Sequence, residues 1–89
     1  MASRRKLKKN VKYFMDDLAT DCLIQEMLNP EVDSTKIDKL LERIMLSRRE
    51  FVSRISHTQP GNVKGYYKQF RNDFSEEVTD IIAELAKFD

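Results

Sequence analysis

Apolar residues recur at steps of three and four along most of the chain, and two short polar stretches interrupt the pattern. The interruptions are Asn29-Pro30 and Pro60-Gly61, both typical of turns. Steps of three and four place side chains on one face of a helix. The pattern therefore predicts three helices, over residues 3–29, 34–57 and 63–88. The apolar positions are Leu7, Val11, Phe14, Met15, Leu18 and Cys22 in the first, Ile37, Leu40, Leu41, Ile44, Met45, Phe51, Val52 and Ile55 in the second, and Val63, Tyr67, Phe70, Phe74, Val78, Ile81, Leu85 and Phe88 in the third.

The helix starts and the links between helices predict the topology. Asp33 or Ser34 can cap the second helix and Asn62 the third. Each helix of about 25 residues spans ~38 Å, whereas the links have only about five residues. Short links favour antiparallel neighbours. We expect an all-α fold, with residues 1–89 forming a single up-down-up three-helix bundle. The alternative is a helical hairpin whose third helix docks onto a second copy.

The composition agrees with a small helical domain. Only two Gly and two Pro occur among 89 residues, 40% of the residues are hydrophobic and 35% are charged. A chain of this composition is too apolar to be disordered, and it contains no apolar run long enough to span a membrane. The basic start lacks a following apolar stretch, which argues against a secretory signal, and a single Cys is compatible with a reducing compartment. We expect a soluble cytoplasmic protein.

The charges are balanced overall but are unevenly distributed. The net charge is +1, from 16 basic and 15 acidic residues. In an up-down-up bundle, one end collects the start of the first helix, the end of the second and the start of the third. That half holds 12 basic residues and Glu50, and the other half holds four basic and 14 acidic residues. The candidate basic end consists of Arg4, Arg5, Lys8, Lys9, Lys12, Arg48, Arg49, Lys64 and Lys68.

This distribution opposes the helix dipole in two of the three helices. Basic residues begin the first helix, and acidic residues crowd the end of the third, whereas a helix favours the reverse. Chance and solubility are one explanation of the separation. A second is self-association, in which the basic end of one molecule meets the acidic end of another. A third is a basic end that contacts nucleic acid phosphates.

The first helix carries more apolar surface than one core stripe needs. At 100° per residue, Tyr13, Ile24 and Met27 lie opposite the core stripe, with Leu23 close to them. Either neighbouring helices and loops cover this second face, or it packs against another chain.

One ion pair and one segment can be predicted more specifically. Arg48 occupies a stripe position where an apolar residue is expected, and a buried charge needs a partner, so we predict an ion pair between Arg48 and Asp73. The segment 64–71 alternates basic and aromatic residues, as in single-strand nucleic acid binders. Tyr66 is its one ring not assigned to the core.

The sequence shows little that indicates catalysis. Cys22 and His57 fall in opposite halves of the expected bundle, and the acidic residues of the first helix lack a Glu-x-x-His partner. Phosphate-binding glycine loops and metal-type Cys or His pairs are missing from the sequence. We therefore expect a protein that is not an enzyme and uses no cofactor or metal.

One resemblance concerns the first quarter of the chain. The segment 4–13, Arg-Arg-Lys-Leu-Lys-Lys-Asn-Val-Lys-Tyr, followed by Asp-Leu-Ala-Thr-Asp-Cys at 17–22, resembles the start of a family of small bacterial helical proteins of unknown function. The resemblance implies a cytoplasmic helical protein and assigns no residue a role.

Together these observations predict a non-catalytic interaction module. The expected partner is a second copy or another helical protein, without a membrane. The alternative is a small protein that contacts nucleic acid through the basic end.

Overall fold

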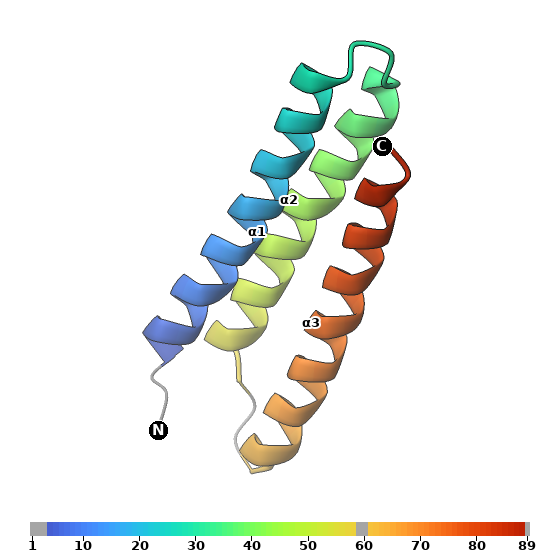
Figure 1. The fold of residues 1–89 in the computed structure, drawn as a ribbon. Coiled ribbons are helices and arrows are strands. Elements are labelled where there is room, and N and C mark those ends of the chain that lie inside the picture. Colours follow the sequence, from blue (N-terminus) through green and yellow to red (C-terminus); the bar gives the residue numbers. More distant parts are fainter. Residues whose placement is uncertain (1–3, 59–60, 89) are drawn as a thin grey trace.

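The computed structural model describes residues 4–58 and 61–88. Three helices, α1 (Arg4–Leu28), α2 (Ser34–Ser56) and α3 (Val63–Ala86), run up, down and up in a bundle measuring 50 × 19 × 18 Å (Figure 1). The described residues contain no strand. The predicted fold class is confirmed, and each helix boundary lies within two residues of its predicted position.

Local side chains fix the starts of α2 and α3. The Asp33 carboxylate accepts a hydrogen bond from the Thr35 amide at 2.9 Å, so Asp33 is the cap of α2 rather than Ser34. The Asn62 side chain accepts one from the Gly65 amide at 3.1 Å, as predicted for a cap. Gly61, just before it, has φ 107°, a conformation that favours glycine. These caps set where the two links end.

The core follows most of the predicted apolar positions. Its buried apolar residues are Val11, Met15, Leu18, Cys22, Ile37, Leu40, Ile44, Phe51, Ile55, Phe70, Val78 and Ile81. Three residues that the pattern assigned to the core, Phe14, Met45 and Val63, are instead exposed. They lie at the edges of the apolar stripes, where a bundle of only three helices leaves side chains uncovered.

Aromatic rings connect the helices in the half of the bundle nearest the basic end. Phe51 of α2 packs edge-on against Phe70 and Phe74 of α3, with ring centroids 5.4 and 5.2 Å apart. Phe14 of α1 meets Phe74 edge-on at 5.9 Å. The Arg54 guanidinium lies 5.3 Å from the Phe51 centroid and 5.4 Å from that of Phe70. This cluster attaches α3 to the α1–α2 hairpin.

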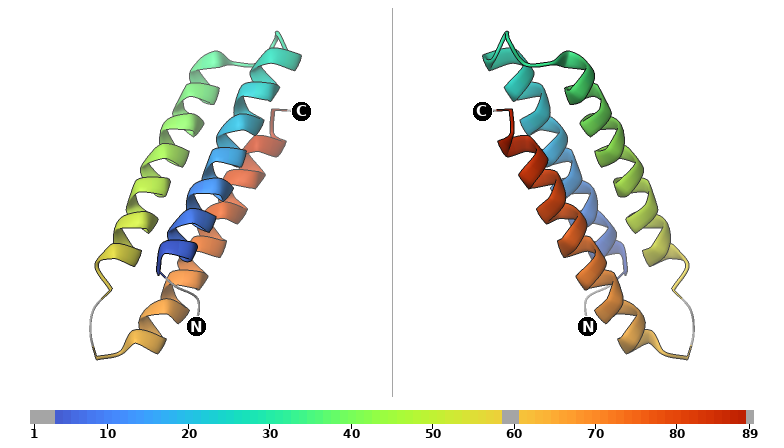
Figure 2. Two further views of the ribbon diagram at one scale, coloured as in Figure 1. Left: turned by 90° about the vertical axis from the view of Figure 1, so that its left-hand side faces the viewer. Right: turned by 90° about the vertical axis from the view of Figure 1, so that its right-hand side faces the viewer.

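The third helix is the least tightly packed of the three. Helices α1 and α2 lie close together along much of their length. Helix α3 comes close to α2 at fewer positions, and to α1 at fewer still. Figures 1 and 2 also show α3 shifted along the bundle, so that its first turns extend beyond the start of α1. Lys64 and Lys68, in those turns, are consequently exposed.

A polar network joins α2 to α3 in the middle of the bundle. The Glu77 carboxylate accepts hydrogen bonds from Arg43 Nε at 3.2 Å and Arg43 Nη2 at 2.7 Å, and from the hydroxyl of Ser47. Arg43 also lies 3.7 Å from Asp80. Ser47 is buried. The hydrogen bonds from Arg43 and Ser47 hold the pKa of Glu77 below its usual value, against the opposing effect of burial.

We expect Glu77→Gln to lower the free energy of unfolding by about 1–2 kcal/mol at pH 7. Because the folded-state pKa of Glu77 is lowered, this stabilisation is present above the unfolded-state pKa of about 4.3 and is lost as pH falls through the folded value. Urea denaturation of the wild-type and Glu77→Gln proteins, at pH values from about 7 down to about 2.5, measures the difference in their free energies of unfolding. Glu76→Gln, at an exposed neighbour, is the control. A difference that persists unchanged at the lowest pH would contradict this role.

Candidate interaction surfaces

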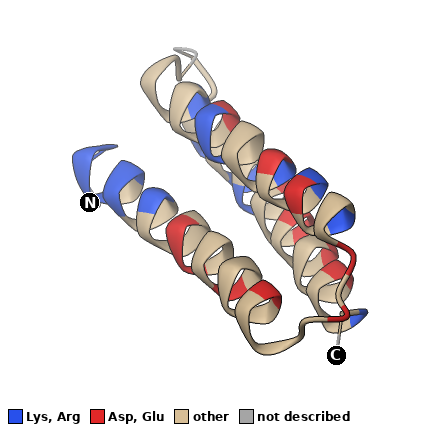
Figure 3. Ribbon diagram, turned by 90° about the horizontal axis from the view of Figure 1, so that it is seen from above, with Lys and Arg blue, Asp and Glu red and all other residues tan. Residues whose placement is uncertain are grey.

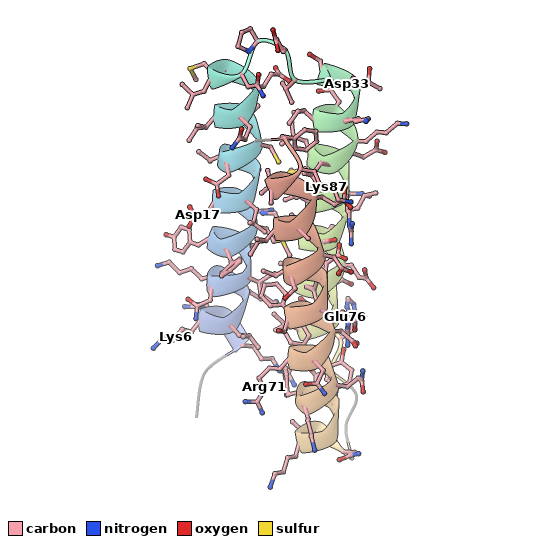
Figure 4. All side chains as sticks on the ribbon, turned by 45° about the vertical axis from the view of Figure 1, so that its right-hand side comes forward. Lys6, Asp17, Asp33, Arg71, Glu76 and Lys87 are labelled. Carbon is pink, nitrogen blue, oxygen red and sulfur yellow. The ribbon has the colours of Figure 1, made fainter. Side chains whose placement is uncertain are left out.

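Basic and acidic residues lie toward opposite ends of α1. The start of α1, the end of α2 and the start of α3 meet at one end of the bundle (Figures 1 and 2). Figure 3 shows basic residues at the start of α1 and acidic residues farther along the same helix. In Figure 4, Lys6 and Arg71 lie toward the first end, Asp33 lies at the other end, and Asp17 lies near the middle of α1. The predicted separation of charge is clear along α1, whereas α2 and α3 carry basic and acidic residues close together, as in the pairs Arg54–Asp73 and Arg43–Glu77.

Most residues of the candidate basic end are available to a partner. Arg4, Arg5, Lys9, Lys12, Arg49, Lys64 and Lys68 are exposed, and Lys8 is half-buried. None of these eight forms an ion pair within residues 4–58 and 61–88. Four of them, Arg5, Lys8, Lys9 and Lys12, line one shallow hollow on α1.

The predicted ion pair between Arg48 and Asp73 is wrong. Arg48 Nε lies 3.0 Å from Asp16 Oδ1 of α1, and Asp73 instead pairs with Arg54 Nη2 at 3.0 Å. The neighbouring Ser47 faces α3 and contacts Glu77, one turn of α3 beyond Asp73, and Arg48 lies 100° around α2 from Ser47. Arg48 therefore faces α1, and its charge is neutralised by Asp16 rather than offered at the basic end.

The Tyr66 side chain also makes contacts within the fold. Its hydroxyl donates to the backbone carbonyl of Arg54 at 2.7 Å, and its ring packs edge-on against Tyr67 at 5.5 Å. The neighbouring Tyr67 hydroxyl shares a 2.6 Å hydrogen bond with Thr58. These contacts tie the start of α3 to the end of α2, so Tyr66 is not a spare ring, although the sequence pattern left it outside the core.

The second apolar face of α1 is exposed. Of the two alternatives that the sequence left open, this agrees with a face available to another chain and not with one covered by the neighbouring helices and loops. Tyr13 is 60% exposed, Ile24 41% and Met27 76%, and Leu23 is exposed between them. Leu28, which the sequence analysis did not single out, extends this face and is 75% exposed. Among the described residues, no loop or neighbouring helix buries these side chains.

A groove between α1 and α3 continues this face toward the third helix. It has a volume of about 530 Å³. Its apolar lining includes Phe14, Ile24 and Ile82, and Asp17 and Asp21 stand beside them. Neither carboxylate forms an ion pair among the described residues. Loose packing of α3 on α1 explains the groove, which residue spacing alone does not reveal.

The acidic half contains an unexpected cluster of cations. Lys36, Lys39, Arg43 and Lys87 all line a hollow of about 740 Å³ between the start of α2 and the end of α3. Arg43 is held by Glu77, and Lys87 pairs with Glu84 at 3.0 Å. Glu31 and Asp33 also line the hollow and offset Lys36 and Lys39. The cluster is thus locally balanced.

The groups considered for catalysis lie far apart or are inaccessible. Cys22 is fully buried in α1, and desolvation with the nearby Asp21 charge raises the pKa of its thiol to about 11. His57 ends α2, where its ring contacts the backbone carbonyl of Ser53. Within the part of the chain that the structure describes, no three His, Cys, Asp or Glu side chains are grouped to hold a metal ion.

Comparison with known proteins gives no relative from which a role can be transferred. The chain matches no protein family, no characterised protein and no solved structure. The resemblance of residues 4–22 to a bacterial helical family stays a prediction. None of the described helices is long and apolar enough to cross a membrane.

Proposed function

We propose that this protein is a non-catalytic cytoplasmic interaction module that associates with a second copy of itself. Membership of the bacterial helical family that residues 4–22 resemble belongs to the same proposal. The observation that carries it is the exposed apolar face of α1, formed by Tyr13, Leu23, Ile24, Met27 and Leu28. Leu23, Ile24, Met27 and Leu28 lie together toward the end of α1, and an exposed apolar cluster of this kind is typical of a protein interaction site.

The charges favour a second copy over an unrelated partner. Each molecule carries a basic end and an acidic end with a net charge of only +1. Two copies packed antiparallel bring opposite charges together at both ends of the interface. Two-fold symmetric dimers are the commonest soluble oligomers, and complementary charges select orientation and speed association.

Light scattering tests the proposal directly. We expect a mass of about twice 10.5 kDa to contribute at about 50 µM, where a binding free energy near −6 kcal/mol gives half-occupancy. A monomer throughout the range up to about ten times that concentration would contradict it.

A second candidate function is contact with a polyanion such as nucleic acid. The hollow lined by Arg5, Lys8, Lys9 and Lys12 supports it, because four cations without ion-pair partners face one surface. The acidic half disfavours a long strand laid along the bundle. Titration with a fluorescent single-stranded oligonucleotide distinguishes the two: a polyanion binder stays monomeric and binds with an affinity that falls steeply with salt.

A further inference from the structure

We infer that the two copies pack α1 against α1 antiparallel, with the two-fold axis near the level of Met15. This inference rests on the proposed self-association and specifies the contact that produces it. Its basis is one line of exposed side chains along α1, formed by Lys6, Tyr13, Asp17 and Ile24.

These four residues share a face of the helix. They are separated by seven, four and seven positions, so their directions around the axis differ by no more than about 40°. All four are exposed. Figure 4 shows Lys6 and Asp17 projecting from the same side of α1. The line runs beside the groove between α1 and α3, which Asp17 and Ile24 border.

The spacing of the line is symmetric about its midpoint, so an antiparallel copy of α1 meets it in register. Residues 13 and 17 then lie opposite each other, and so do residues 6 and 24. The Tyr13 hydroxyl is placed to donate to Asp17 of the second copy, and the Lys6 methylenes cover Ile24. Within the described residues, neither the Tyr13 hydroxyl nor the Asp17 carboxylate has a hydrogen bond or ion pair of its own. Lys9, 5.7 Å from the Tyr13 ring centroid, adds positive charge near the same carboxylate.

Other arrangements of two α1 helices bring like charges together. A parallel pair sets Lys6 against Lys6 and Asp17 against Asp17. A pair joined only at the exposed Ile24, Met27 and Leu28 gathers the acidic ends, including Asp21 and Glu26 of both copies. Like charges placed opposite each other oppose association. The antiparallel register near Met15 instead overlaps the basic start of one helix with the acidic part of the other.

Disulfide trapping tests this register. Tyr13→Cys and Asp17→Cys proteins are mixed in equal amounts, oxidised with copper phenanthroline, and mapped by mass spectrometry of the linked peptides. We expect the mixed 13–17 disulfide to be the main product. Same-residue pairs are offset by four residues, about 6 Å along the axis, which puts their Cα atoms beyond disulfide range. Cys22 stays in place because it is buried and its thiol pKa is raised to about 11. Leu46→Cys, at an exposed position on α2, mixed with Tyr13→Cys is the matched control.

The outcomes separate this inference from the proposed function. The 13–17 disulfide, with little of the control product, supports the register. A dimer by mass whose Ile24→Cys protein links to itself instead, without the 13–17 product, overturns the register and leaves self-association standing. A monomer by mass with no disulfide above the control overturns both.

Discussion

Replacement of Phe70 by alanine is expected to lower the free energy of unfolding by about 3–5 kcal/mol. Phe70 is 2% exposed and packs against Phe51, Tyr67 and Phe74. Its ring also supports the Arg54 guanidinium, which pairs with Asp73. The substitution removes a large ring from the cluster that joins α3 to α2, and the cavity left behind adds to the lost burial. Denaturation in urea, followed by circular dichroism, measures the change.

Phe14→Ala is the matched control for this substitution. Phe14 touches Phe74 from α1 but is 45% exposed, so its loss should cost about 1–2 kcal/mol. The difference between the two variants isolates the role of the α2–α3 cluster. Equal costs, or a Phe70→Ala cost below about 1 kcal/mol, would show that this cluster does not hold α3 in place.

Replacement of Ile24 by lysine is expected to raise the dimer dissociation constant by about 10- to 30-fold. Ile24 lies on the proposed contact line of α1, opposite Lys6 of the second copy, so a lysine there places two like charges against each other. A penalty of about 1.4–2 kcal/mol gives that ratio. Sedimentation equilibrium of the wild-type and variant proteins measures both constants.

Leu46→Lys provides the control for Ile24→Lys. Leu46 is 55% exposed on α2, and its replacement makes the same change in charge and in side-chain type. We expect it to leave the dissociation constant within about two-fold of the wild-type value. If both variants weaken association equally, the effect comes from net charge and not from the face of α1.

The sequence allowed the helices and topology to be predicted because apolar periodicity and two interruptions determine both. Predictions of side-chain contacts succeeded less well. The predicted pairing of Arg48 with Asp73 was wrong both in level and in face. Asp73 pairs with Arg54, more than one turn farther along α2, and Arg48 lies on the face of α2 that meets α1. The orientation of α2 between two neighbours depends on how all three helices pack, and the sequence pattern does not specify this.

The polar network of Ser47 and Glu77 was also missed, although the sequence contained a signal for it. Ser47 lies three residues after Ile44, and Glu77 lies three residues after Phe74, so both interrupt apolar stripes. Polar residues in such positions on neighbouring helices are candidates for a shared hydrogen bond. Which of the available acids Arg43 joins depends on the shift of α3 along the bundle, visible only in the structure (Figures 1 and 2).

The candidate surface was predicted in part. The exposed face of Tyr13, Leu23, Ile24 and Met27 follows from helix periodicity alone. Its continuation into the groove beside Ile82 does not, because that groove results from the loose packing of α3 on α1. The same periodicity also places Leu28 on this exposed face, because Leu28 lies next to Met27 and away from the core stripe.

The salt dependence of the dissociation constant tests the central claim most directly, because opposite charges on one molecule orient and stabilise the proposed dimer. Sedimentation equilibrium at about 50 mM and about 500 mM sodium chloride compares weak with strong screening. We predict a dimer at low salt whose dissociation constant rises by about ten-fold at high salt. A monomer at both salt concentrations, or a dimer that tightens as salt increases, would contradict it.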